Sequence, residues 1–250
     1  MEKVSNLSTA DWPRQHRTDR GQRREISIIV PVLNEAPLIR GFLQHLRSQA
    51  PDAEIIVVDG GSSDGTAELA RELADRVSVT EAGRAVQMNA GARAASADIL
   101  WFLHVDTEVP RECVENIIGA LRDKHVVGGF FRIRLPRQAL IFRATDTLAH
   151  YLGLICRIRC GDHGLFCRRE LFFAVDGFPE VALMEDVAFY RALCRHGRMR
   201  VIPSRLIVSP RRYENRGPYR VTAAYGLIAF LFMLGVRRAF LLCLYRRFCA

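Results

Sequence analysis

Three apolar runs in the first 106 residues each end in a polar cluster, and no other feature of the sequence constrains the fold as strongly. The runs cover residues 26–33, 54–58 and 99–103, and segments with helical spacing separate them. Near-continuous apolar runs of this length are typical of strands that are buried on both faces of a parallel sheet. Because strands and helices alternate, we expect right-handed crossovers and a doubly wound α/β fold.

The alternation continues along the chain. Helices are predicted over about residues 36–49, 64–75, 84–96, 110–123, 138–158 and 184–195, and further strands over about 126–135 and 165–167. With 250 residues, of which 49% are hydrophobic, the chain is long enough to bury one sizeable core. We therefore expect one α/β domain over residues 26–215.

The net charge of +9 results from 36 Lys and Arg against 27 Asp and Glu. Residues 11–24 hold five arginines without apolar periodicity, which predicts a disordered basic tail over residues 1–25. A basic protein favours anionic partners such as nucleotides or phospholipid surfaces. Nucleic acid is not an expected partner, because basic strands rich in aromatic residues are missing.

The cysteines indicate a reducing compartment. Seven is an odd number, and the sequence has no Cys-x-x-Cys pair, which favours reduced thiols in a cytoplasmic protein. The first 25 residues also contain no apolar segment of the kind found in secretory signals. We therefore expect a cytoplasmic location.

The end of the chain differs in character from the rest. Residues 221–236 are almost wholly apolar, and a shorter apolar run follows over residues 239–245. At about 16 residues, the first run is shorter than the ~20 that a membrane-spanning helix needs. Over residues 216–250 we therefore expect two apolar helices. They either lie peripherally on the inner face of the cell membrane, with arginines at the headgroups, or pack on the domain itself.

Polar residues follow each of the three runs, and the fold predicts that they meet. Glu35 follows the first run and Asp59 follows the second. His104 and Asp106 follow the third. Ligands of open α/β sheets bind beyond the carboxyl ends of the strands, so we expect these side chains along one rim. Three carboxylates and a histidine suit a divalent cation and a hydroxyl-rich ligand.

The turn over residues 59–66 joins the second strand to a helix and contains three glycines. Glycines let the backbone approach a ligand closely, and a helix start offers unpaired N–H groups to an anion. The turn matches neither Gly-x-Gly-x-x-Gly nor a phosphate loop that ends in Gly-Lys-Ser/Thr, which disfavours dinucleotide oxidoreductases and P-loop enzymes. Asp64 suits a helix cap, whereas Asp59 ends the strand and points to the rim.

Four motifs in this order resemble those of the family 2 glycosyltransferases, which have the GT-A fold. They are IIVPVLNE at residues 28–35, VVDGGSSDGT at 57–66, FLHVD at 102–106 and MED at 184–186. The resemblance covers about residues 26–215. It implies a Rossmann-like, mostly parallel sheet flanked by helices, and a metal-dependent, inverting glycosyltransferase.

The same resemblance implies a set of donor-binding residues in a nucleotide-sugar site, with UDP-sugar the favoured donor and GDP-sugar the next. They are Pro31, Asn34, Glu35, Asp59, Arg84 and His104, together with Arg211 and Arg212 near the diphosphate. For the two last arginines a solvated basic face is the alternative.

His104 stands where the family usually has the first Asp of an Asp-x-Asp motif. By resemblance, Asp106 holds Mg²⁺ or Mn²⁺, which bridges the donor diphosphate. A neutral imidazole at His104 either ligates the metal or hydrogen-bonds a ribose hydroxyl, although hard Mg²⁺ prefers oxygen. With His at this position, the chain resembles a subgroup that is named for arsenosugar biosynthesis.

The acceptor side is implied for the second half of the chain. Asp186 corresponds to the general base, which removes the proton of the acceptor hydroxyl as the new bond forms. Asp162, His163 and Glu185 are further acceptor- or sugar-side candidates. The alternatives are that Glu185 interacts with a helix macrodipole and that Asp162 caps a turn.

The resemblance implies a nucleotide sugar and a small-molecule or lipid-linked acceptor as partners. A second hypothesis is a catalytically silent, nucleotide-binding and membrane-associated protein of the same fold, in which His104 marks a lost metal site. Metal-dependent hydrolysis of a nucleotide sugar separates the two hypotheses.

Overall fold

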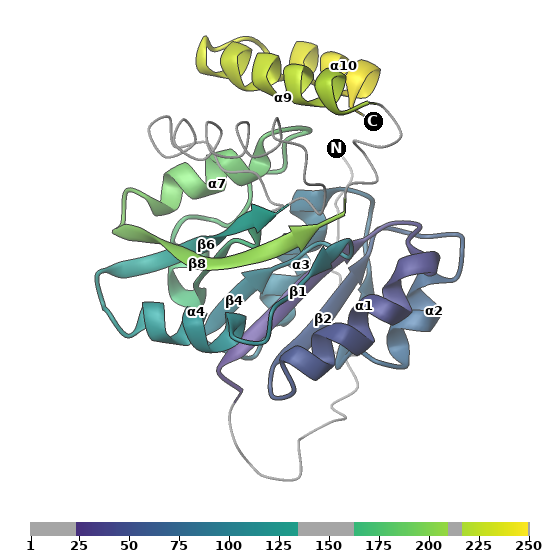
Figure 1. The fold of residues 1–250 in the computed structure, drawn as a ribbon, viewed down its shortest axis with the longest axis vertical. Coiled ribbons are helices and arrows are strands. Elements are labelled where there is room, and N and C mark those ends of the chain that lie inside the picture. The colour runs from purple at the N-terminus through teal and green to yellow at the C-terminus, as the bar shows by residue number, and fades with distance from the viewer. Residues whose placement is uncertain (1–23, 135–162, 210–216, 250) are drawn as a thin grey trace, which may run out of the picture.

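The computed structural model describes residues 24–134, 163–209 and 217–249 (Figure 1). Most of the tail predicted over residues 1–25, and the whole helix predicted over 138–158, lie outside these ranges. The described strands form one sheet in the order β3-β2-β1-β4-β7-β6-β8-β5. They are β1 (Ile26–Val32), β2 (Glu54–Asp59), β3 (Arg76–Val79), β4 (Ile99–Phe102), β5 (Thr107–Glu108), β6 (Val126–Arg134), β7 (Phe166–Arg168) and β8 (Arg198–Val208).

The first half of the sheet is parallel, as predicted. β1 lies between β2 and β4 and is parallel to both, and β3 continues this half beside β2. Val32 pairs with Asp59, so β1 and β2 end at the same level. In the other half, β6 is parallel to β8, whereas β7 and β5 are antiparallel to their neighbours. The predicted α/β fold class with a mostly parallel sheet is therefore confirmed.

Helices cover both faces of this sheet. The described helices are α1 (Ala36–Gln49), α2 (Thr66–Arg71), α3 (Arg84–Ala94), α4 (Cys113–Leu121), α6 (Arg169–Ala174), α7 (Glu185–Leu193), α9 (Pro218–Met233) and α10 (Arg238–Phe248), of which α9 and α10 lie apart from the sheet faces. Ile28 and Val30 of β1 share one core with α1, α2 and α4. Ile29, which points to the opposite face, shares a second core with α3, α6 and α7. Burial on both faces explains why the apolar run shows no polar alternation.

α3 packs closely on the sheet because Gly91 faces it. A Cβ atom at Gly91 would overlap the side chain of Ile29 and would lie 3.2 Å from Cγ2 of Val58. In a parallel crossover the helix runs antiparallel to its strands. Arg84, at the start of α3, therefore lies near the carboxyl ends of β1 and β2.

The C-terminal helices α9 and α10 form a layer at one end of the molecule, next to α7 (Figure 1). Met184 and Val187 at the start of α7 share a core with Ala224 and Ile228 of α9 and with Leu241 of α10. One side of the helix pair therefore packs on the domain, as one of the two predicted alternatives requires. In the part of the chain that the structure describes, no helix combines the length and apolarity that crossing a bilayer needs.

The five cysteines in the described ranges are free thiols. Burial raises the pKa of Cys113 to about 12, and it also raises the pKa of Cys167. Both thiols therefore stay protonated at neutral pH, and they contribute to packing rather than to nucleophilic chemistry.

Candidate active site

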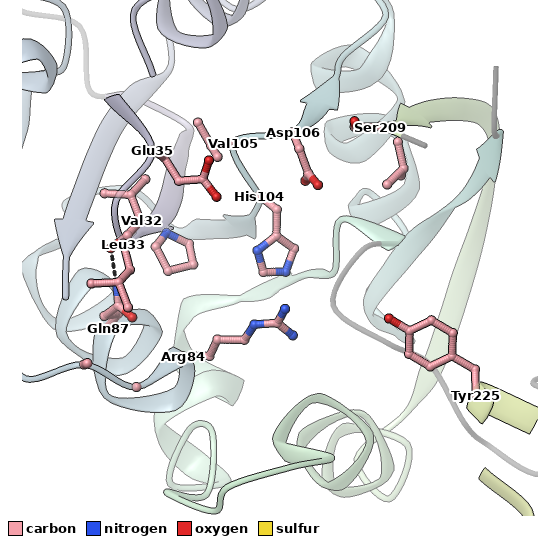
Figure 2. Close-up of a pocket in the computed structure, with 14 residues that line it drawn as sticks. Val32, Leu33, Glu35, Arg84, Gln87, His104, Val105, Asp106, Ser209 and Tyr225 are labelled. Carbon is pink, nitrogen blue, oxygen red and sulfur yellow. Dashed lines mark hydrogen bonds between the residues drawn. The ribbon is translucent and has the colours of Figure 1, made fainter. Parts of the chain in front are cut away.

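A cavity of about 420 Å³ lies beyond the carboxyl ends of β1 and β4, where this kind of sheet binds ligands (Figure 2). Five separate segments of the chain form its wall. The lining residues are Pro31, Val32, Leu33, Glu35, Ala82, Gly83, Arg84, Gln87, His104, Val105, Asp106, Val208, Ser209 and Tyr225. The sequence-predicted site residues among them are Pro31, Glu35, Arg84, His104 and Asp106.

Two loops at the edge of the cavity are tied together by hydrogen bonds. Asn34 adopts a left-handed conformation with φ of 53°, and its Oδ1 accepts the backbone N–H of Ser63 at 3.0 Å. The Ser62 hydroxyl accepts the N–H of Asn34 at 2.8 Å, and Asp64 Oδ2 accepts the N–H of Ala36 at 3.0 Å. Asn34 is not among the cavity-lining residues, so in this structure its side chain shapes the loop, and its donor contact stays a prediction.

Asp64 connects the first turns of two helices. Besides Ala36 at the start of α1, it accepts the hydroxyl and the backbone N–H of Thr66 at the start of α2. These hydrogen bonds lower the pKa of Asp64, and the one from the Thr66 hydroxyl has the largest effect. Gly65 is the N-cap residue of α2, but Asp64 accepts the N–H of the first residue of both helices.

Asp59 is buried at the end of β2 and is not among the cavity-lining residues. Its Oδ1 accepts the N–H groups of Gly61 and Ser62 at 2.7 and 2.6 Å, which holds the glycine turn. Its Oδ2 is also buried and has no hydrogen-bond partner among the described residues. A buried carboxylate oxygen without a partner is costly, so a donor N–H from a ligand would be favourable at this position.

Gln87 lines the cavity but is not among the site residues predicted from the sequence. Its Nε2 donates to the carbonyl oxygens of Val32 and Val58, both at 2.8 Å, and so joins the ends of β1 and β2 (Figure 2 shows the first bond). Gly60 leaves room for this side chain, since a Cβ there would lie 3.2 Å from Cδ of Gln87. A glutamine at a buried position of α3 is the signal that could have identified it.

His104 occupies the centre of the cavity. Figure 2 shows its ring between the carboxylates of Glu35 and Asp106 on one side and the guanidinium of Arg84 on the other. The loop that carries it is fixed at two points, by a Thr107 N–H that donates to the His104 carbonyl and by a Ser209 N–H that donates to the Asp106 carbonyl. Side chains from α3 and from the segments that follow β1 and β4 thus meet although they are far apart in sequence.

The carboxylates of Glu35 and Asp106 offer the oxygen ligands that Mg²⁺ and Mn²⁺ prefer. Within the described ranges, however, no three His, Cys, Asp or Glu side chains form a metal-binding group. A cation at Asp106 would therefore need further oxygen ligands from water or from a bound diphosphate. These residues fit a cation that binds together with its nucleotide.

An ion pair connects the cavity wall to the MED motif. Arg84 Nη1 lies 3.9 Å from Oε1 of Glu185, which is buried in the first turn of α7. Met184 precedes this turn with φ of 62°. Asp186 is buried beside Glu185, and its Oδ1 accepts the N–H of Val187 at 2.7 Å. Asp186 is not among the cavity-lining residues, so its catalytic role stays a prediction.

The remaining candidates, on the acceptor side and near the diphosphate, do not line the cavity or lie outside the described residues. His163 Nδ1 lies 3.1 Å from the carbonyl oxygen of Phe131, and its ring packs edge-on against Phe130. His163 is not among the residues that line the cavity. Asp162, Arg211 and Arg212 lie outside the described residues.

Two further lining residues, Ser209 and Tyr225, come from the second half of the chain. Ser209 follows β8, and Tyr225 belongs to α9. Figure 2 shows Tyr225 on the side of the cavity opposite Glu35. The sequence gives no signal for Tyr225, because one tyrosine in an apolar helix looks like a packing residue.

The sheet and its cavity define a Rossmann-like α/β protein with a ligand site at the strand ends. Residues 27–170 match the model of Glycosyl transferase family 2, which is more than half of the chain. The chain therefore belongs to this family, as the motifs predict.

Relatives from other organisms support this assignment. Glycosyltransferase AglE of Haloferax volcanii is 32% identical over 169 residues, which cover 62% of this chain and 56% of the relative. Succinoglycan biosynthesis protein ExoA of Rhizobium meliloti is 31% identical over 176 residues, which cover 61% and 52%. The chain thus spans about half the length of these relatives.

Solved structures confirm the predicted GT-A-type fold. Mannosyltransferase PcManGT from Pyrobaculum calidifontis, in complex with GDP-Man and Mn²⁺, has a TM-score of 0.64 at 24% identity, covering 88% of this chain and 66% of that one. S. aureus TarS 1-349 in complex with UDP-GlcNAc has a TM-score of 0.58 at 20% identity, covering 74% and 58%. At these identities the likeness concerns the fold.

Proposed function

We propose that the protein transfers a sugar from a nucleotide-sugar donor to an acceptor hydroxyl, with a divalent cation and with inversion at the anomeric carbon. The observation that carries this proposal is the cavity itself. It brings Glu35, Arg84, His104 and Asp106 together at the strand ends in a chain of glycosyl transferase family 2.

The donor nucleotide would bind along the ends of β1 and β2. Oδ2 of Asp59, which has no partner among the described residues, suits an N–H group of the base. We propose UDP-sugar as the donor, with GDP-sugar the next candidate. Arg84 extends into the cavity, where its guanidinium suits an oxygen of the diphosphate. GDP-Man in PcManGT and UDP-GlcNAc in TarS are the donors bound to two structures of similar fold.

Asp106 would hold Mg²⁺ or Mn²⁺, and when bound this cation offsets the charge that develops on the departing diphosphate. His104 is either a further ligand or a hydrogen-bond partner of the ribose. Because it has His at this position, the chain is proposed to belong to the subgroup named for arsenosugar biosynthesis. Two structures of similar fold, PcManGT and a mycobacterial glucosyl-3-phosphoglycerate synthase, contain Mn²⁺.

Asp186 would act as the general base. The acceptor oxygen forms a bond to the anomeric carbon, the bond from that carbon to the diphosphate breaks, and the hydroxyl proton moves to the Asp186 carboxylate. Attack opposite the leaving group inverts the anomeric configuration. The Arg84–Glu185 contact supports this assignment, because it holds the first turn of α7 against the donor side of the cavity.

The acceptor would be a small molecule or a lipid-linked molecule. Among the relatives are an undecaprenyl-phosphate 4-deoxy-4-formamido-L-arabinose transferase of Edwardsiella ictaluri and a dolichol-phosphate mannosyltransferase of Pyrococcus furiosus. Their names favour a lipid-linked acceptor. A cytoplasmic protein at the inner face of the membrane would meet such a substrate.

A thermal-shift screen of UDP- and GDP-sugars with and without Mn²⁺ tests the proposal. A donor at 100 times its Kd should add about 2.7 kcal/mol to stability. The competing hypothesis is a catalytically silent nucleotide-binding protein, which His104 in place of a carboxylate favours. It predicts nucleotide stabilisation without Mn²⁺-dependent hydrolysis of any donor. Absence of stabilisation by every donor would contradict both.

A further inference from the structure

α9 carries an exposed apolar stripe along its full length. Tyr219, Leu227, Phe230 and Met233, together with Leu234 directly after the helix, are between 46% and 68% exposed. Their spacing places them on one face of the helix. For a helix that packs on its own domain, so many large apolar side chains in solvent are unusual, and exposed patches of this kind indicate a binding surface.

The opposite face of α9 is already in use. Val221, Ala224 and Ile228 are buried, and the last two share a core with Met184 and Val187 of α7. The exposed stripe is therefore not needed for packing on the domain. In Figure 1 the α9–α10 layer lies at the end of the molecule, and no other described element covers its outer side. Phe240 of α10 adds a further side chain that is 53% exposed.

The charged residues of the two helices all have one sign. Residues 217–250 contain five arginines and no acidic residue. Arg220 lies at the start of α9, Arg237 directly precedes α10, and Arg238 is its first residue. Two more arginines lie at the end of α10. Several of them sit beside aromatic rings of the layer, such as Arg238 over Phe232 at 6.0 Å and Arg220 over Phe248 at 5.4 Å.

We propose that the outer face of α9 and α10 binds an anionic lipid surface, with the exposed stripe in the acyl boundary and the arginines at the phosphates. An apolar stripe flanked by arginines is complementary to such a surface. A second copy of the chain fits less well, because a two-fold contact would bring the arginines of both copies together. α9 has 16 residues, so it lies in the interface rather than crossing the bilayer.

The position of this surface bears on the kind of acceptor, and this inference rests on the proposed function. α9 also contributes Tyr225 to the cavity wall, two residues from Leu227 of the stripe. A protein seated on lipid through α9 would therefore hold its cavity close to the membrane. We infer that the acceptor hydroxyl or phosphate is carried by a lipid, with the apolar part of that lipid remaining in the bilayer.

The test is co-sedimentation of the full chain with two kinds of vesicle. One kind is pure phosphatidylcholine, and the other also contains on the order of 30% phosphatidylglycerol, to imitate an anionic cytoplasmic leaflet. We expect anionic vesicles to bind at least about tenfold more strongly, with binding reduced by salt. The double variant Leu227→Ser with Phe230→Ser should lose binding. Its matched control is Val79→Ser, which changes an exposed apolar residue on the distant edge strand β3.

A charge variant separates the electrostatic part of vesicle binding from the apolar part. The double variant Arg237→Gln with Arg238→Gln should weaken binding to anionic vesicles and reduce the salt dependence of that binding. The control is Arg93→Gln with Arg122→Gln, which changes two exposed arginines on α3 and at the end of α4 and should leave binding unchanged. Equal vesicle binding by the stripe variant and Val79→Ser would overturn the proposal. A dimer in sedimentation velocity that the stripe variant abolishes, without vesicle binding, would assign the face to a second copy. Donor stabilisation by nucleotide sugars is measured without vesicles, so failure of the proposed function is seen independently.

Discussion

The side chain of Asn89 and the backbone of Phe178 form a reciprocal, buried pair of hydrogen bonds. Asn89 Nδ2 donates to the Phe178 carbonyl at 2.8 Å, and its Oδ1 accepts the Phe178 N–H at 2.9 Å. Asn89 lies on α3, whose first residue is Arg84, and Phe178 belongs to the segment that leads to Glu185. The pair therefore fixes the acceptor-side segment against the helix that forms the donor side of the cavity.

Asn89→Ala should destabilise the protein by about 2–4 kcal/mol, because it leaves a buried N–H and a buried carbonyl of Phe178 without partners. Urea denaturation measures this change. Asn116→Ala is the matched control, since Asn116 is only half-buried and makes one hydrogen bond to Ser204. It should cost about 1 kcal/mol or less. Similar losses in both variants would argue against a special role for the Asn89 pair.

Acid should weaken the contact between the N-terminal part of the domain and the sheet edge. Burial raises the pKa of Asp75, but hydrogen bonds from Arg24, the Ile55 N–H and Arg47 outweigh it and hold the pKa below its usual 3.8. A lowered folded-state pKa gives stability above the unfolded pKa, which is lost as pH falls through the folded value.

Asp75→Asn should therefore flatten the decline of unfolding free energy below about pH 4 and lower stability at pH 7. Chemical denaturation over a pH series measures both effects. Asp52→Asn, which changes an exposed carboxylate nearby, should leave the slope as it is. An unchanged slope in Asp75→Asn would show that this carboxylate does not control acid stability.

The elements predicted best from sequence are those with long, uninterrupted patterns. β1 and α1 match closely because burial on both faces produces a continuous apolar run and because the amphipathic helix 36–49 has a Pro in its first turn. β8 was missed. Its residues alternate between exposed and more buried positions, but its pairing with β6 is irregular at Pro203. Ile202 pairs with Phe131, and the next pair is Arg205 with Arg132, so two residues of β8 are left out of the pairing. The bulge breaks the period on which prediction depends.

The same contrast applies to the site. Glu35, His104 and Asp106 could be placed together from sequence, because the strand-end rule needs only strand order and direction. Tyr225 could not, because its position depends on how α9 packs on α7, which is a tertiary contact without local signal. Asn34 illustrates a third case, in which a motif residue near the cavity holds a loop by hydrogen bonds to residues of the next turn.

Removal of the Asp106 carboxylate tests the proposed cation site. Asp106→Ala should abolish the Mn²⁺-dependent part of donor binding, because the diphosphate then meets Glu35 without the compensating charge. Calorimetric titration of the donor with Mn²⁺ and with EDTA measures this part. Glu108→Ala, an exposed carboxylate on β5, is the control. Equal Mn²⁺-dependent affinity in Asp106→Ala would move the cation elsewhere.

His104→Asp restores the residue type that the family usually has at this position. If the imidazole only replaces a carboxylate, the variant should keep or raise the rate of transfer and should bind Mn²⁺ more tightly, since hard cations prefer oxygen ligands. Initial rates at varied Mn²⁺ concentration measure both quantities. Loss of turnover with tighter Mn²⁺ binding would instead show that the imidazole contacts the substrate.

Asp186→Asn tests the proposed base most directly. The substitution keeps the size of the side chain and the acceptor of the Val187 N–H, but it removes the basic carboxylate. Donor affinity should therefore survive, while transfer should fall by about 10² to 10⁴, the usual contribution of a positioned base. Glu185→Gln is the control, because it should weaken the contact with Arg84 and raise the donor KM more than it lowers kcat. If Asp186→Asn lost donor binding together with turnover, the carboxylate would have a structural role. Near-normal transfer would assign the base to another residue, with Glu185 and Asp162 the next candidates.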